Sequence, residues 1–194
     1  MKLKKINAVL GLVTSLLMLV HILYSAYCYL TFYYNPDLKL LTALPFIVLC
    51  CLHAILGMAA VFTQSDGTRM DLYPKQNLAT VLQRLSAALI FPLLLLHLNT
   101  FAWLKSAAAG GRWILFALTI AAQVLFYAVV ILHVAVSLSR SLITLGCLAS
   151  RERQTALNRV VYILALLLFL AAAFAVVKGQ IGMIPMFLPE GGAA

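Results

Sequence analysis

The chain has 194 residues, of which 64% are hydrophobic and only 10% are charged. Soluble globular proteins average roughly 45–50% apolar and about 25% charged residues, so this chain has too few charged side chains to cover a water-facing surface. The composition excludes a soluble enzyme, a nucleic-acid-binding domain and a disordered chain. It predicts an integral membrane protein, in which the net charge of +9 has to be interpreted by position.

Five apolar stretches are long enough to cross a bilayer, which takes about 20 mostly apolar residues in a helix. They cover residues 6–32, 40–63, 78–104, 113–148 and 157–177, and polar segments at 64–77 and 150–158 interrupt the series. A barrel would instead show alternating strands of about ten residues. We therefore predict an all-α fold, with residues 1–194 forming one transmembrane bundle of five helices.

The first apolar stretch follows three lysines and could be taken for a secretory signal peptide. It is too long for one, and cleavage after Ala26 would place the bulky Tyr24 where a small residue is required. We interpret it as an uncleaved first helix.

Basic residues are distributed unevenly between the two ends of the predicted helices. Ten fall inside and four outside if the N-terminus is cytoplasmic, and such an excess is typical of cytoplasmic loops. The inner set is Lys2, Lys4, Lys5, Arg69, Lys75, Arg84, Arg140, Arg151, Arg153 and Arg159, and the outer set is Lys39, Lys105, Arg112 and Lys178. The sequence therefore predicts a cytoplasmic N-terminus and an external C-terminus.

Histidines and carboxylates are partitioned differently. The first four apolar stretches contain one histidine each, His21, His53, His97 and His133, whereas all five acidic residues lie in loops or the tail. Placing a charged side chain inside the membrane costs roughly 2–4 kcal/mol, and placing a neutral imidazole there costs less. Because either is unfavourable, an ionisable residue in a membrane span is expected to have a structural or functional role. A single buried histidine is most often a packing residue. Four of them, one per helix, indicate a function within the membrane.

Depth along the helices separates the histidines into two levels. At about 1.5 Å per residue, His97 and His21 lie about 10 and 12 Å below the outer surface, and His133 lies about 30 Å below it. His53 lies about 15 Å above the inner surface, near enough to mid-depth to exchange places with His21. This predicts His21 with His97 toward the outside and His53 with His133 toward the inside.

Two imidazoles on facing helices at one depth are the ligands that a bis-histidine b haem needs. Arg140, seven residues after His133, could bind a haem propionate or act as a positive-inside anchor. A zinc or copper site needs three or four ligands at one depth, which the spread of about 20 Å from His97 to His133 disfavours.

Small and polar residues share faces with the histidines. Gln83, Ser86 and Thr100 align with His97, and Gly57 follows His53 by one turn, where it could admit a macrocycle or a neighbouring helix. Such stripes also form ordinary helix contacts. The fifth stretch has no histidine, and we predict a structural role for it.

Single histidines on the first four of five helices resemble the dihaem cytochrome b membrane anchor of succinate dehydrogenases and fumarate reductases. The resemblance is one of topology and spacing and covers the whole chain. It implies an outer haem between His21 and His97 and an inner haem between His53 and His133. It also implies a menaquinone site in the membrane, a bacterial cell membrane, and a cytoplasmic flavoprotein, usually with an iron–sulfur subunit, docked on the inner face.

Two features qualify this resemblance. Some fumarate reductases of the family carry a proton-moving glutamate two residues before the fourth-helix histidine, where this chain has Ile131. Quinone-site residues do not carry over; Asp37, with Asn35 and Tyr34, could accept quinol protons or form an ordinary turn.

The sequence thus predicts an electron-transferring subunit of an oxidoreductase and leaves open whether it is itself catalytic. Alternatives are a single haem or a different partner, a haem-free transporter or complex scaffold whose histidines serve packing or proton relay, and a metal-dependent membrane enzyme. The internal repeats typical of transporters and the intramembrane carboxylates typical of proton relays are not found in the sequence.

Overall fold

A computed structural model describes residues 2–63 and 74–188. In these ranges the chain forms helices and no strand: α1 (Lys2–Thr31), α2 (Pro36–Thr63), α3 (Pro74–Ala109), α4 (Trp113–Leu145), α5 (Arg151–Gly182) and the short α6 (Ile184–Phe187). The first five are long and apolar enough to span a bilayer. The predicted all-α bundle of five spanning helices is confirmed, and the protein is a multi-pass membrane protein.

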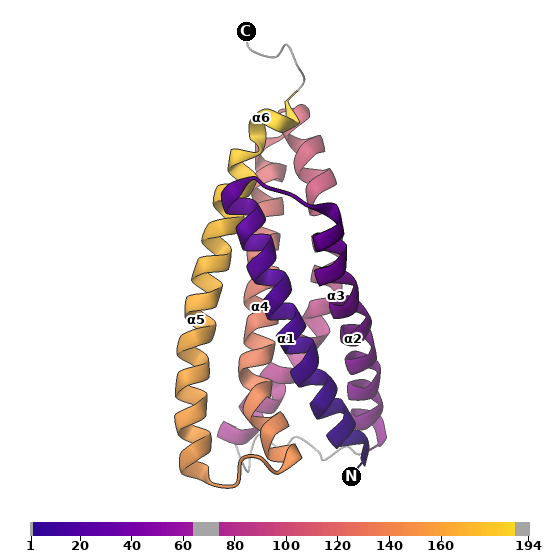
Figure 1. Ribbon diagram of the computed structural model, residues 1–194, viewed down its shortest axis with the longest axis vertical. Helices are drawn as coiled ribbons and strands as arrows, with labels where there is room; N and C mark the ends of the chain where they lie inside the picture. Colours follow the sequence, from indigo (N-terminus) through magenta and orange to yellow (C-terminus); the bar gives the residue numbers. More distant parts are fainter. Residues whose placement is uncertain (1, 64–73, 189–194) are drawn as a thin grey trace.

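The long helices alternate in direction, with α1, α3 and α5 running upward in Figure 1 and α2 and α4 running downward. We call the end that carries the start of α1 the lower end and the opposite end the upper end. In the described residues, Lys2, Lys4 and Lys5 lie at the lower end, as do the loop and first turns that join α4 to α5.

Several helix ends differ from the sequence prediction. The sequence predicts that the fifth helix starts at residue 157, but α5 already begins at Arg151 within the polar segment 150–158, where the Ser150 hydroxyl accepts a hydrogen bond of 3.2 Å from the Arg153 N–H. Helix α4 ends three residues earlier than predicted, because Gly146 adopts a left-handed conformation (φ 84°) that closes the helix. The other predicted polar segment, 64–77, falls largely outside the described residues.

Helix α4 lies at the centre of the bundle and packs against α1, α3 and α5, whereas α2 packs mainly on α1. The core joins Met18 and Ile22 of α1 to Phe126 and Val130 of α4 and Val176 of α5. Helix α2 has no buried residue. Large apolar side chains cover the exterior of the bundle, where the hydrocarbon of the membrane replaces water.

Candidate functional site: two histidine pairs

Helices α1 to α4 each bring one histidine into the bundle. His21 and His97 lie ten and twelve residues from the upper ends of α1 and α3, and His53 and His133 lie ten and twelve residues from the lower ends of α2 and α4. The ring centroids are 6.5 Å apart in the upper pair, His21 with His97, and 6.4 Å apart in the lower pair, His53 with His133. The structure therefore brings together the two pairs that were expected from depth.

Both separations match the span of a metal ion held between two rings. A metal–imidazole bond is about 2.0 Å long and a ring centre lies about 1.2 Å from its own nitrogen, so two imidazoles on opposite sides of one metal ion have centres about 6.4 Å apart. Among the described residues, α1 makes few or no close backbone contacts with α3, and the same is true of α2 and α4. Each pair therefore joins two helices that have few direct backbone contacts with each other.

Two rings packed edge to face have a similar centroid separation, so this distance alone does not distinguish metal ligands from packed rings. The hydrogen bonds of the ring nitrogens provide a second criterion. In the lower pair, His53 Nδ1 lies 3.2 Å from the backbone oxygen of Asn7, and His133 Nδ1 lies 3.2 Å from that of Gln83. A carbonyl oxygen only accepts, so both Nδ1 atoms carry the hydrogen and donate it. The Ser86 hydroxyl, 3.0 Å from His133 Nδ1, supports the same ring orientation.

The upper pair is held by side chains instead. His21 Nδ1 lies 3.4 Å from Thr42 Oγ1, and the Thr42 hydroxyl donates to the backbone oxygen of Lys39 (3.1 Å), so it is free to accept from the ring. His97 Nδ1 lies 2.6 Å from the side-chain amide of Gln123. In the part of the chain that the structure describes, no hydrogen bond reaches the Nε2 atom of any of the four rings.

This pattern is typical of metal-ligating histidines, in which one ring nitrogen is held by the protein and the other is left for the metal. Each pair thus has two Nε2 atoms that no hydrogen bond occupies among the described residues. A tetrahedral site needs three or four ligands, and no group of three His, Cys, Asp or Glu side chains converges among the described residues.

Two of the four buried polar atoms without a hydrogen-bond partner among the described residues lie near the lower pair, and a third, Gln180 Oε1, lies at the upper end of α5. Of the four such atoms in the described residues, Asn7 Oδ1 belongs to the residue whose carbonyl holds His53, and Ser137 Oγ lies one turn below His133. Thr14 Oγ1 lies on α1 midway between Asn7 and His21. Unpaired buried polar groups cost about 1–3 kcal/mol each, so a bound group with polar substituents would fit this interior better than an apolar one.

Arg140 is connected to the lower pair through a single residue. Its Nη1 atom donates to Gln83 Oε1 at 3.2 Å, and the backbone oxygen of the same Gln83 accepts from His133. A partly buried guanidinium therefore contacts the residue whose backbone holds His133. Its contact with a propionate remains a prediction.

The close approach expected at Gly57 is found at Gly11 instead. A Cβ atom at Gly57 would lie 3.6 Å from Asn7 Nδ2, an ordinary contact, whereas one at Gly11 would lie 2.9 Å from Cε1 of His53. Thr42 and Gln123, which contact the two rings of the upper pair, are not among the residues predicted from the sequence. The one available signal was an isolated amide, Gln123, within an apolar stretch.

The turn at the start of α2 has a structural explanation. Asn35 Oδ1 accepts from the backbone N–H groups of Asp37 (3.0 Å) and Leu38 (3.2 Å), and the Tyr24 hydroxyl donates to the Asn35 carbonyl (2.9 Å). The ordinary-turn interpretation of this segment accounts for these contacts.

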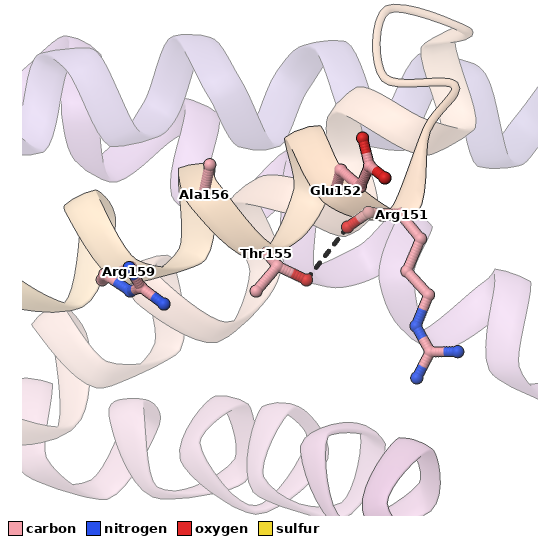
Figure 2. A pocket seen from close by; sticks show the side chains of 5 residues that line it. All are labelled: Arg151, Glu152, Thr155, Ala156 and Arg159. Carbon is pink, nitrogen blue, oxygen red and sulfur yellow. Dashed lines mark hydrogen bonds between the residues drawn. The ribbon is translucent and has the colours of Figure 1, made fainter.

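A surface hollow lies far from the histidines, at the lower end of α5. Its lining comprises Arg151, Glu152, Thr155, Ala156 and Arg159 (Figure 2). The side chains of Arg151 and Glu152 point away from each other, and the Thr155 hydroxyl donates to the Arg151 carbonyl of its own helix (2.9 Å). These groups do not converge on one ligand, so the histidine pairs are the better candidate site.

Comparisons with protein-family models, with curated proteins and with solved structures find no match to this chain.

Proposed function

We propose that this protein is a membrane cytochrome b that holds one b haem between the histidines of the upper pair and a second between those of the lower pair. The observation that carries the proposal is the repeated arrangement of the two pairs. In each pair the ring centroids are separated by about the distance expected for two imidazoles on one metal ion. Each Nδ1 lies within hydrogen-bonding distance of a neighbouring group, and among the described residues no hydrogen bond reaches any Nε2.

Haem b with two axial histidines exchanges single electrons and has no open coordination position. In this proposal the four rings would hold the two haems, and the groups on their Nδ1 atoms would orient the rings. Arg140, Asn7 and Ser137 supply polar contacts around the lower pair. The apolar side chains of the core, such as Phe126 and Val130, exclude water from the interior.

The two levels support electron transfer across the membrane. Ser86 contacts His133 of the lower pair and lies eleven residues below His97 of the upper pair on the same helix, which separates the levels by about 16 Å. That is about half of a hydrocarbon core of about 30 Å. We propose that electrons pass along this line between a membrane quinone such as menaquinone and a cytoplasmic flavoprotein or iron–sulfur oxidoreductase, in a bacterial cell membrane.

A second candidate, a haem-free transporter or scaffold, rests on the aromatic contacts of the upper pair. The His21 ring stacks on Phe46 (centroids 6.0 Å apart), and the His97 ring lies 5.0 Å from that of Phe126. Rings packed in this way can contribute to stability without a ligand.

The decisive experiment is the absorption spectrum of the purified protein, expressed with ample haem, together with its haem content. We expect the reduced-minus-oxidised spectrum of low-spin b haem and two haems per chain. His21→Ala, His97→Ala and the double variant should each lose the same haem, and His53→Ala and His133→Ala should each lose the other.

The cross-pair variant His21→Ala/His53→Ala is the matched control, because it should lose both haems. A colourless wild-type protein would overturn the proposal and favour the haem-free candidate. Loss of both haems from every single variant would show that the pairs do not bind independently.

A further inference from the structure

Gln123 is an amide buried in the bundle beside the upper pair. Its side chain is 2% exposed on α4 and lies between two groups of α3. Its Nε2 atom is placed 2.6 Å from His97 Nδ1, and its Oε1 atom lies 2.9 Å from Thr100 Oγ1. A half-turn of the terminal amide exchanges these two atoms without moving any other group.

The two orientations of the amide differ in which donors of His97, Gln123 and Thr100 find an acceptor. With nitrogen toward His97, the ring must accept at Nδ1 and carry its hydrogen on Nε2, for which the described residues offer no acceptor. With oxygen toward His97, the ring donates from Nδ1, and the amide nitrogen donates to Thr100 Oγ1. The Thr100 hydroxyl then donates to the Leu96 carbonyl, 3.0 Å away. The second orientation leaves one fewer buried donor without a partner in the described part of the chain, because His97 then carries no hydrogen on Nε2.

The second orientation also gives His97 the same hydrogen placement as the other three histidines. The Nδ1–H groups of His53 and His133 donate to backbone carbonyls, and that of His21 faces a hydroxyl whose own hydrogen is donated elsewhere. The upper pair is thus held by side chains alone, whereas both rings of the lower pair also have a main-chain carbonyl as partner. Acceptors on Nδ1 raise the basicity of the ligand and shift the potential of the metal it binds.

We infer that Gln123 is a positioning residue: its carbonyl oxygen holds His97 in the Nδ1–H form and tunes the reduction potential of the upper haem without affecting the lower haem. The tuning rests on the proposed function, whereas the hydrogen placement on His97 does not.

Redox titration of the purified protein tests the tuning, with Gln123→Glu and Gln123→Leu as the variants. Glu keeps an acceptor for Nδ1–H and adds negative charge, so the midpoint potential of one haem should shift downward with both haems retained. Leu removes the acceptor, so the potential of the same haem should shift upward or that haem should be lost. The second haem reports in each variant that the bundle has folded.

Thr119→Val is the matched control, because Thr119 is also buried on α4, one turn from Gln123, but its hydroxyl donates only to the Leu115 carbonyl of its own helix (2.8 Å). Both potentials should stay at their wild-type values in this variant. Unchanged potentials in both Gln123 variants, or equal shifts of the two haems, would overturn the tuning.

The hydrogen placement is tested in haem-free protein, by nitrogen NMR of ¹⁵N-labelled imidazoles. The His97 signals, assigned by their loss in His97→Ala, should show a hydrogen on Nδ1 and none on Nε2. The reverse pattern would overturn the assignment of Gln123 whether or not the protein binds haem. A colourless wild-type protein with hydrogen on Nδ1 would overturn the proposed function and the tuning, and would leave the role of Gln123 in holding His97 intact.

Discussion

The space beside His53 is set by one residue, Gly11 of α1. A Cβ atom there would lie 2.9 Å from His53 Cε1, closer than non-bonded carbon atoms approach, so a side chain would have to displace the ring. The ring is also held by the Asn7 carbonyl from the same helix. We expect Gly11→Ala to move His53 away from His133 and to lower haem content from two per chain toward one.

Gly57→Ala is the control for Gly11→Ala, because its new Cβ would meet Asn7 Nδ2 at an ordinary 3.6 Å. Both changes replace a helical glycine by the better helix former alanine, so general effects on helix stability should be similar. Haem content measured by pyridine haemochrome should fall only in Gly11→Ala. Equal haem content in the two variants would contradict the steric role of Gly11.

Arg140 offers a charged group to the lower pair. A hydrogen bond to a charged group contributes about 1.5–3 kcal/mol, so Arg140→Gln should weaken retention of the lower haem about tenfold or more and leave the upper haem in place. The measurement is transfer of haem to a scavenger such as apomyoglobin. Arg159→Gln, at an exposed position on α5, should release both haems at the wild-type rate, and an equal rate in Arg140→Gln would refute the contact.

The depth of each histidine could be predicted from the sequence, whereas its neighbours could not. Depth follows from the constant rise of a helix and from aromatic and charged residues at its ends. Contacts such as Gln123 with His97 depend on how each helix is rotated about its axis. Membrane helices are apolar on the lipid side and on the core side, so their sequence does not reveal which face points inward.

At the scale of elements, α5 is joined to the upper end of α1 by close packing at two glycines. A Cβ atom at Gly179 would lie 2.5 Å from Cβ of Tyr29, which is fixed to the backbone, and one at Gly182 would lie 2.5 Å from Cζ of Phe32. The Gln180 side chain donates to the Tyr29 hydroxyl (3.3 Å) across the same contact. The small-residue face of α5 thus lies against aromatic side chains of α1.

Substitution at the two glycines should have unequal effects. Gly179→Ala forces α1 and α5 apart, which we expect to destabilise the protein by about 1–3 kcal/mol. Gly182→Ala should cost less, because the ring of Phe32 is half exposed and can swing away. Thermal unfolding in detergent compares the two variants, and an equal loss of melting temperature would show that the Tyr29 contact is not tight.

At the same scale, the sequence predicted the existence of the five helices and missed the start of α5. Apolar length identifies the part of a helix that lies in hydrocarbon. Helical turns outside the bilayer are polar, and their start depends on a local cap, here Ser150 with the Arg153 N–H. Hydropathy therefore gave the spans and could not give this helix end.

At the scale of the whole molecule, charge is concentrated at one end of the bundle. The lower end carries Lys2, Lys4 and Lys5 at the start of α1 and Arg151 and Arg153 at the start of α5. The upper end carries fewer basic residues, among them Lys105 and Arg112. The positive-inside rule therefore predicts that the lower end faces the cytoplasm, which would place the lower pair nearer to a cytoplasmic electron-transfer partner.

Cys147 can test this orientation, since it is exposed just beyond the lower end of α4. With the other three cysteines replaced by alanine, a membrane-impermeant maleimide should label Cys147 in inside-out vesicles and leave it unlabelled in intact cells. Ala109→Cys in a cysteine-free background, exposed at the upper end of α3, should show the opposite pattern. Labelling of Cys147 from outside intact cells would invert the topology, and the lower pair would then lie on the external side.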